Sequence, residues 1–308
     1  MNNNSDRARF WNDQVWAAID DGVTKAVGAI RVAQKVFPAT QLTGVTSVPA
    51  DVFDPKEMKI DEGKTRAYVE LAVEFTLTNG QVSDDTTGTT AITLSKLAAK
   101  SLALAEDIIM LQGTKVKLPP RVEIESGRDA AEQGILDLVI SNPIVVKAPD
   151  PGAPTNSGGE ILAAITQGIA ELTNHVQAPP YALIEDTNAF AATWGSVING
   201  APAYTVLTPL LTGGIYGTGA MPPNTGLLVA LGGDPTTIYF DSDPMTEPTT
   251  RAARGRYSFR TFERIQFVAR DNRAFVKLDF SYLGQKIRYE RESSISIDEI
   301  RTDRLVNK

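Results

Sequence analysis

Alternating and helical patterns of hydrophobic residues predict a chain that mixes strands with helices. Residues 66–78 (RAYVELAVEFTLT) alternate apolar and polar side chains with a period of two, which predicts a half-buried strand. Residues 89–113 (TTAITLSKLAAKSLALAEDIIMLQG) carry a broad apolar face at helical spacing and end at a glycine, which predicts a long, largely buried helix. From Arg7 to Lys35, apolar residues recur at helical spacing beside two tryptophans, and Phe37-Pro38 ends this amphipathic helix.

Shorter elements are predicted in the second half of the chain, and no internal repeat is visible. The expected helices cover residues 160–173 and 187–194, and the second of them begins after an Asp186 cap. Residues 114–157 read as weaker strands and loops that end in a Pro/Gly/Ser-rich hinge, KAPDPGAPTNSGG. Strands are expected at residues 181–184, at 226–231 and 237–240 as a hairpin across GGDP, and at 257–269 and 274–282 on either side of an RDNR turn.

The segment at residues 39–65 differs from its surroundings. Its few apolar residues are scattered among prolines and glycines, which is typical of a long β-rich loop or an extended hairpin with little core of its own. A loop of this length in a compact domain is usually functional, disordered or held by a neighbour. We therefore expect this loop and the N-terminal helix to contact other chains.

Composition and charge exclude several classes of protein. Apolar residues make up 42% of the 308 positions and charged residues 22%, as in soluble globular proteins. No apolar run is long enough to span a bilayer, and the polar N-terminus is not typical of a secretory signal, so we expect assembly in the cytoplasm. The net charge of −7 argues against wrapping of nucleic acid over the whole surface. The arginine-rich segment from Arg251 to Arg273 indicates an interface or a solvated strand face, with nucleic-acid contact as the alternative.

Candidate chemistry is sparse. Cysteine is absent, which removes thiol chemistry, and His175 is the one histidine, with no nucleophile motif beside it. The glycine-rich stretch at residues 213–224 is predicted to be a flexible loop and not a phosphate site, because Pro222-Pro223 blocks the helix that such a site needs.

Two pairs of acidic residues are the remaining candidates for catalysis or cation binding. The neighbouring Glu106 and Asp107 point about 100° apart on a helix, which favours salt bridges or solvated edges over a shared substrate. Asp241 and Asp243 could share a cation, yet the rest of a calcium loop is missing. The sequence therefore predicts no catalytic, cofactor-binding or metal site, no cofactor and no enzymatic activity.

Three stretches together resemble the encapsulin and tailed-phage major capsid protein superfamily, whose members share the Hong Kong 97-like capsid fold. The first is the opening helix WNDQVWAAIDDGV, and the second is YVELAVEFTLT followed by a polar gap and the long helix that ends AEDIIMLQG. The third is the order of GEILAAITQGIAEL, PPYALIEDTNAFA, GLLVALGGDPTTIYF and RYSFRTFERIQFVARDNRAFVKLDF. The similarity covers roughly residues 7–280, and it rests on order and spacing more than on any one motif.

The resemblance implies an α+β chain with the parts of a Hong Kong 97-like subunit. The expected parts are an N-terminal helical arm (residues 1–38), an extended loop (39–66), a peripheral domain with a spine helix (67–157, helix 89–113), a mainly axial domain (158–250), and the closing strands of the peripheral domain with a C-terminal tail (251–308). It also implies self-assembly into an icosahedral shell of pentamers, with hexamers as a further option.

Two departures favour the phage branch of this superfamily. Encapsulins usually carry a G-Q-D-L-S-I-G-Y-like run where this chain has DSDPMTEP, and they usually stop soon after the last strand, whereas this chain continues from Ser281 to Lys308. The sequence therefore favours the head protein of a tailed phage or prophage, in a virion capsid assembled in the host cytoplasm around DNA, with portal, scaffolding or decoration proteins as further partners and no membrane contact.

Two alternatives stay open. One is a cytoplasmic encapsulin nanocompartment around a cargo enzyme, with an apolar cargo groove lined by Trp16, Ile19 and strand residues near Phe262. The other is a small-molecule-binding or hydrolytic enzyme that uses the glycine-rich loop, for which a well-formed pocket with perturbed titratable groups would be needed.

Overall fold

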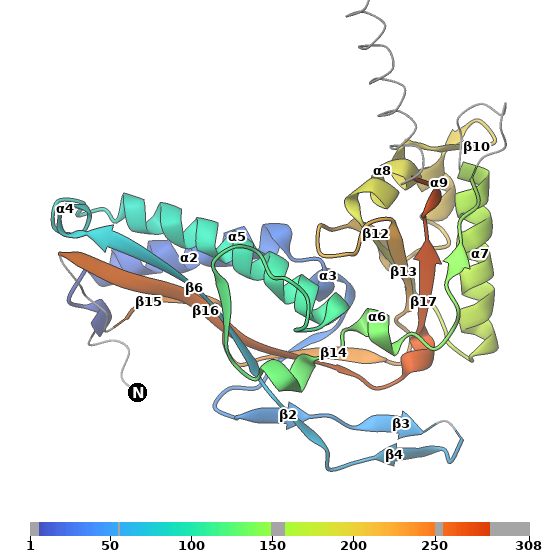
Figure 1. Cartoon of the computed structure of the whole chain (residues 1–308), viewed down its shortest axis with the longest axis horizontal. Coiled ribbons are helices and arrows are strands. Elements are labelled where there is room, and N and C mark those ends of the chain that lie inside the picture. Colours follow the sequence, from blue (N-terminus) through green and yellow to red (C-terminus); the bar gives the residue numbers. More distant parts are fainter. Residues whose placement is uncertain (1–5, 55, 149–157, 250–254, 284–308) are drawn as a thin grey trace, which may run out of the picture. The chain divides into compact units, whose positions relative to one another are not determined.

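The computed structural model describes residues 6–54, 56–148, 158–249 and 255–283, and the chain divides into two compact units (Figure 1). Unit 1 comprises Met1–Leu138 and Gly233–Asn272, and unit 2 comprises Val139–Gly232 and Arg273–Lys308. Both units mix helices with a sheet, so the predicted α+β class is confirmed. Residues 149–157 of the predicted hinge at 147–159, and the predicted tail at 285–308, lie outside the described residues.

Unit 1 is built on a six-stranded sheet with the order β1-β14-β16-β6-β7, in which β15 also pairs with β16. Its central pair, β6 and β16, is antiparallel, with a register that runs from Arg256 opposite Thr78 to Ile265 opposite Val69. The strands are β1 (Ala39–Gln41), β6 (Val69–Thr78), β7 (Val122–Ser126), β14 (Thr236–Phe240), β15 (Met245–Pro248) and β16 (Arg256–Ala269).

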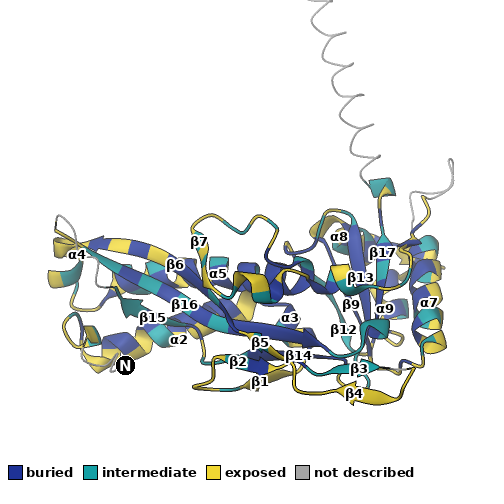
Figure 2. Cartoon of the chain, turned by 60° about the horizontal axis from the view of Figure 1, so that its bottom comes forward, coloured by how far each residue is buried: buried dark blue, intermediate teal, exposed yellow. Residues whose placement is uncertain are grey.

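Alternation along the two central strands decides which face of this sheet is covered. On β6, Leu71, Val73, Phe75 and Leu77 are buried, while most of the residues between them are exposed or half-buried (Figure 2). The predicted strand at residues 66–78 is confirmed, although its first residues belong to a separate strand, β5 (Thr65–Ala67). A period of two therefore separates an apolar face from a polar one.

Two long helices of unit 1, α2 and α5, pack on each other and cover this apolar face (Figure 1). The N-terminal helix is shorter than predicted: it begins at Asp13 and ends at Ile30, because the backbone of Arg31 is not helical. Asn12 caps its start by accepting the N–H of Val15 at 3.0 Å. The helical segments of unit 1 are α2 (Asp13–Ile30), α3 (Ala33–Val36), α4 (Asn79–Ser83), α5 (Thr89–Gln112), η1 (Arg128–Ala131) and α6 (Ile135–Leu138).

The predicted spine helix is confirmed as α5, and its end at Gly113 has a steric reason. Gly113 has a φ of 82°, and a Cβ there would lie 2.2 Å from the carbonyl oxygen of Glu132. Only glycine allows both this left-handed conformation and so close a backbone approach.

Unit 2 has a five-stranded sheet with the order β12-β9-β13-β17-β8. The central strands β9 and β13 are buried throughout. The strands of this unit are β8 (Ile144–Val145), β9 (Tyr181–Glu185), β10 (Val197–Ile198), β11 (Ala201–Pro202), β12 (Gly214–Gly217), β13 (Thr225–Ala230) and β17 (Phe275–Asp279). Its helical segments are α7 (Gly158–Asn174), α8 (Thr187–Gly195) and α9 (Ala203–Leu207), and η2 (Asn272–Ala274) spans the boundary between the units.

Two predictions for this part of the chain are wrong. The strands β13 and β14 do not form a hairpin, because β13 pairs with β9 and β17 in unit 2, while β14 pairs with β1 and β16 in unit 1. The glycine-rich stretch is not simply a flexible loop, because Gly214–Gly217 forms β12, parallel to β9. Close packing requires a glycine in this strand, because a Cβ on Gly217 would lie 2.6 Å from the ring of Phe190.

Candidate functional site

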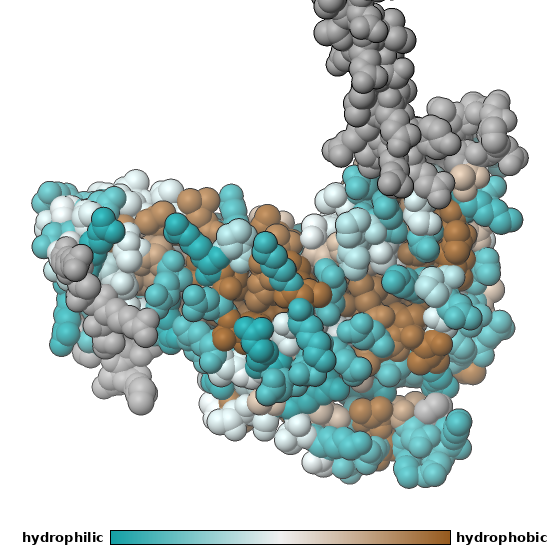
Figure 3. All heavy atoms as spheres, viewed as in Figure 1, coloured by the Kyte–Doolittle hydropathy of each residue, from teal (hydrophilic) through white to brown (hydrophobic). Residues whose placement is uncertain are grey.

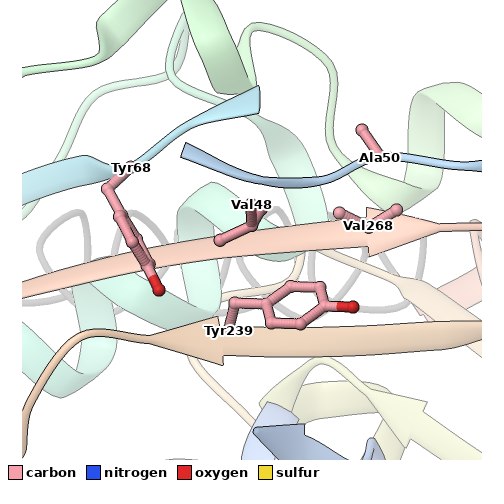
Figure 4. Close-up of a cluster of buried hydrophobic side chains, with 5 residues drawn as sticks. All are labelled: Val48, Ala50, Tyr68, Tyr239 and Val268. Carbon is pink, nitrogen blue, oxygen red and sulfur yellow. The ribbon is translucent and has the colours of Figure 1, made fainter. Parts of the chain in front are cut away.

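The long loop at residues 39–67 is anchored at its base. It contains two two-stranded ladders, β2 (Ser47–Pro49) with β5, and β3 (Val52–Asp54) with β4 (Lys59–Asp61). Around the first ladder lies a buried cluster of Val48, Ala50, Tyr68, Tyr239 and Val268 (Figure 4). This cluster joins the loop to strands β14 and β16, so the base of the loop is fixed on the face of the sheet opposite the helices.

The tip of the same loop exposes apolar side chains. Met58 and Ile60 are 79% and 57% exposed. Figure 3 shows hydrophobic side chains among hydrophilic ones at the β3–β4 hairpin. Large apolar side chains at the end of an anchored hairpin are typical of a contact with another chain. We name this segment, residues 52–61, the loop tip.

The N-terminal arm, residues 6–38, is held by aromatic rings. The ring of Phe259 on β16 lies 5.1 Å from Phe10, 5.5 Å from Trp11 and 5.7 Å from Phe75. Trp11 donates a hydrogen bond from its indole N–H to the carbonyl of Asp85 at 3.0 Å. The aromatic cluster therefore fixes the start of α2 against the sheet and against the segment before α5.

A pocket of about 430 Å³ opens beside the start of this arm. It is lined by Asp6, Arg9, Phe10, Val82, Pro248, Thr249 and Tyr257. The lining is not the predicted one: Trp16 and Ile19 are only 4% and 0% exposed, so they belong to the core. Phe262 lies on the opposite face of β16 from Phe259, where it stacks under Arg260.

The other end of the arm meets a buried cluster of charges. Arg31 donates from Nε to Glu106 of α5 and from Nη2 to Glu263 of β16, and both glutamates are almost fully buried. Asp107 accepts the backbone N–H groups of Val32 and Ala33 at 2.8 and 2.9 Å. The predicted salt bridging of Glu106 is confirmed, whereas solvated edges are wrong for both acids, because neither reaches solvent.

Burial dominates the proton affinity of these carboxyl groups. It raises the pKa of Glu106 well above the ordinary value, and the neighbouring Glu263 raises it further. Burial also raises the pKa of Glu263. The pKa of Asp107 rises to about 6 for the same reason, against the opposing effect of its two backbone donors. We name Arg31, Glu106, Asp107 and Glu263 the arm cluster.

Arg31 and Glu263 were not among the residues predicted from the sequence to form a site. A signal exists for Glu263, because it occupies an inward position in the alternating strand at residues 256–269, between Thr261 and Ile265. An acid at such a position needs a buried partner.

Two arginines of β16, Arg260 and Arg264, are paired with acids of the same chain. Arg260 bonds Glu247 at 2.8 Å and also Glu70 and Glu125, and Arg264 bonds Asp241 at 2.8 Å. These contacts favour the strand-face interpretation over nucleic-acid contact for Arg260 and Arg264, because their charge is already paired. They also remove Asp241 from the candidate cation pair with Asp243.

Glu185, at the end of β9, is a fully buried acid of unit 2. One of its oxygens accepts the hydroxyl of Thr193 at 2.7 Å, and the other has no hydrogen-bond partner among the described residues. Burial raises the pKa of Glu185 to about 8. The next residue, Asp186, caps α8 as predicted by accepting the N–H of Ala189 at 2.6 Å.

Replacing Glu185 with glutamine should change the pH dependence of stability in unit 2. The folded pKa lies above the ordinary value of 4.5, so the folded state binds the proton more tightly and wild-type stability falls as pH rises from about 4.5 to about 8. The advantage of Glu185→Gln over the wild type should therefore grow by about 2 kcal/mol between pH 6 and pH 8. Urea unfolding at both pH values, followed by circular dichroism, checks this, and a constant difference would contradict it.

Other candidate chemistry is not assembled in the described parts of the chain. His175 lies at the end of α7, 3.5 Å from Glu171. Within residues 6–54, 56–148, 158–249 and 255–283, no three His, Asp or Glu side chains are placed to hold a metal ion. In the same ranges, no helix combines the length and the apolar character needed to cross a membrane.

Comparison with solved structures identifies the fold. The chain is similar to a virus-like particle from Pyrococcus furiosus, with a TM-score of 0.62 and 15% identity over 86% of this chain and 99% of that one. A structure from Mycobacterium phage Bobi matches with a TM-score of 0.57 and 15% identity over 81% and 90% of the two chains. The holo-SrpI encapsulin complex from Synechococcus elongatus matches with a TM-score of 0.51 and 10% identity over 80% and 86%.

Sequence comparison identifies the family. No curated protein sequence matches the chain. The profile of the Linocin_M18 family, described as "Encapsulating protein for peroxidase", matches residues 2–246, which is most of the chain. With the Hong Kong 97-like fold shared by encapsulins and phage capsids, this match shows a shell-forming capsid protein and not an enzyme: the chain belongs to the Linocin_M18 family of encapsulins.

Proposed function

We propose that this chain forms a closed icosahedral nanocompartment that encloses a protein cargo. The observation that carries the proposal is the family match, which includes the N-terminal arm and describes an encapsulating protein. The pocket beside the arm supports it, because Phe10, Val82, Pro248 and Tyr257 give it an apolar lining that suits an extended peptide. The cargo in this proposal is an enzyme, as the family description names a peroxidase.

Separate roles for the two units belong to the same proposal. Unit 1, with the spine helix α5, would be the peripheral domain, and unit 2 would be mainly the axial domain around the symmetry axes. These bounds differ from those expected from the sequence, because residues 233–249 belong to unit 1 and the strand β17 belongs to unit 2. Pentamers, with or without hexamers, would then close the shell. The loop tip of one copy would cover a neighbouring copy, because its exposed Met58 and Ile60 have an apolar surface to bury.

The loop-tip assignment predicts a variant that folds and does not assemble. In Met58→Ser/Ile60→Ser, no buried contact of the chain is lost, so circular dichroism should match the wild type. Burying these two side chains stabilises each contact by about 3 kcal/mol, and every copy makes that contact, so shells should be largely lost in sedimentation. The exposed Val145 of unit 2 offers a control, and shells of Val145→Ser should form normally. Wild-type amounts of shell from the double variant would contradict the assignment.

The contents of the shell test the cargo proposal. Particles purified from the native source and treated with nuclease should contain a stoichiometric second protein and little protected DNA. Tyr257→Ser should lower the amount of that protein per shell, because the substitution removes an aromatic wall of the pocket without opening the core. Phe262→Ser, on the opposite face of the same strand, should leave it unchanged. Cargo that is equal in both variants would contradict a role for the pocket.

A second candidate, the head protein of a tailed phage or prophage, is favoured by a specific observation. The fold is similar to structures from phage Bobi and phage XM1, and the run at residues 241–248 departs from the encapsulin pattern. In this case, the shells would assemble in the host cytoplasm, protect genome-length DNA, and add portal, scaffolding or decoration proteins. Nuclease-resistant DNA in native particles would select this candidate.

A further inference from the structure

The arm cluster has more acid than base at a site closed to water. Arg31 and Glu263 are 8% and 1% exposed, and Glu106 and Asp107 are fully buried. With all four groups ionised, the cluster would carry a net charge of −2. Burying one unpaired charge costs several kcal/mol, so this protonation state strongly disfavours the docked arm.

Asp107 is balanced separately from the two glutamates. Its oxygens accept the N–H groups of Val32 and Ala33, at the start of α3, where backbone donors stabilise a negative charge. Glu106 and Glu263 have one cation between them, Arg31, and Gln34 adds a neutral donor to Glu106 at 2.9 Å. One oxygen of Glu263 has no hydrogen-bond partner among the described residues.

One proton on the glutamate pair resolves this imbalance. With one carboxyl neutral and the other ionised, Arg31 faces a single negative charge. The neutral group also has a hydroxyl to donate to its neighbour, as in other pairs of close carboxylates. Among the described residues, the charged groups that act on one another here are Arg31, Glu106, Asp107 and Glu263, and the residue of β6 opposite Glu263 is the apolar Leu71.

We propose that Glu106 and Glu263 share one proton beneath Arg31, and that loss of this proton at alkaline pH releases residues 31–38 of the N-terminal arm from helix α5 and strand β16. This segment is the part of the arm that would be released. The backbone between α2 and α3 is not helical, and the segment is held there by its bonds to Glu106, Glu263 and Asp107. This pH-dependent release does not depend on what the shell encloses, because all the groups involved belong to unit 1 of a single chain.

Hydrogen exchange compared between variants at equal pH tests the proposal. Glu263→Gln keeps the length and both hydrogen-bonding roles of the protonated acid and removes the titration. The full-length wild type and this variant would be measured by mass spectrometry from pH 6 to pH 10, in the same assembly state. The intrinsic exchange rate is the same for both proteins at a given pH and cancels in the ratio of their exchange rates. The ratio for peptides that cover residues 31–38 therefore reports release of the arm.

The ratio of exchange rates, wild type over Glu263→Gln, should be at least about tenfold larger at pH 10 than at pH 6, because the opening equilibrium of the wild type shifts about tenfold for each pH unit between the ordinary carboxyl pKa of 4.5 and the raised pKa of the docked pair. Glu106→Gln should give the same ratio, and it serves if Glu263→Gln does not fold. Glu185→Gln, which removes a buried acid of unit 2, should exchange like the wild type in these peptides. A ratio that stays within about twofold across the pH range would overturn the proposal.

Discussion

Replacing Arg31 with methionine should lower the free energy of unfolding of unit 1 by about 3–5 kcal/mol at pH 8. The methionine fills most of the volume of the arginine, so the loss is mainly electrostatic: Glu106 and Glu263 remain buried without a cation. Lowering the pH should reduce the effect, because both glutamates bind protons more readily than ordinary carboxyl groups and become neutral.

The matched control is Arg260→Met on the same strand as Glu263. Arg260 also bonds several glutamates, but its side chain is 22% exposed, and partly solvated ion pairs contribute about 1 kcal/mol or less. Urea unfolding of dissociated subunits, followed by the fluorescence of Trp11 and Trp16 in a Trp194→Phe background, measures both variants. Equal losses for the two arginines would contradict the account of the arm cluster.

Replacing Phe259 with alanine should lower the free energy of unfolding of unit 1 by about 3–5 kcal/mol in the same assay. Phe259 is fully buried, and it contacts the rings of Phe10, Trp11 and Phe75. Its removal leaves a cavity between the arm and the sheet, so the fluorescence of the arm tryptophans should also shift toward that of exposed indoles.

Phe262→Ala is the control for this prediction, because it makes the same substitution three residues along β16. Phe262 lies on the other face of the strand and is half-buried under Arg260, so the loss should be about 1 kcal/mol. A loss below about 1 kcal/mol for Phe259→Ala would show that the arm is not held by these rings.

Local pattern predicted the long elements well, because their periodicity reports burial directly. The period of two in β6 and the broad apolar face of α5 each identified an element, and Gly113 marked the end of the spine helix. The family resemblance, based on the order of these elements, is confirmed by the profile match over residues 2–246.

Pairing between distant segments was not predictable in the same way. The strands β13 and β14 follow one another across GGDP, as in a hairpin, yet the chain leaves unit 2 for unit 1 between them. Gly214–Gly217 has no apolar alternation, and its strand is specified by a parallel partner and by the space that Phe190 needs. Strand propensity depends on such neighbours, which a local window does not contain.

The candidate site was only partly visible in the sequence. The long loop was predicted from its composition, but its anchoring cluster joins Val48 to Tyr239 and Val268, which come from opposite ends of the chain. The arm cluster likewise joins Arg31 to Glu106 and Glu263. The acids alone indicated salt bridges, and the fold was needed to show that they are buried around one arginine.

Electron microscopy of the full chain, expressed alone and purified, shows directly whether this protein builds a closed shell by itself. We expect uniform icosahedral particles of one diameter that contain no other protein. Monomers and small oligomers alone, across the ranges of salt and pH in which the chain is folded, would contradict it.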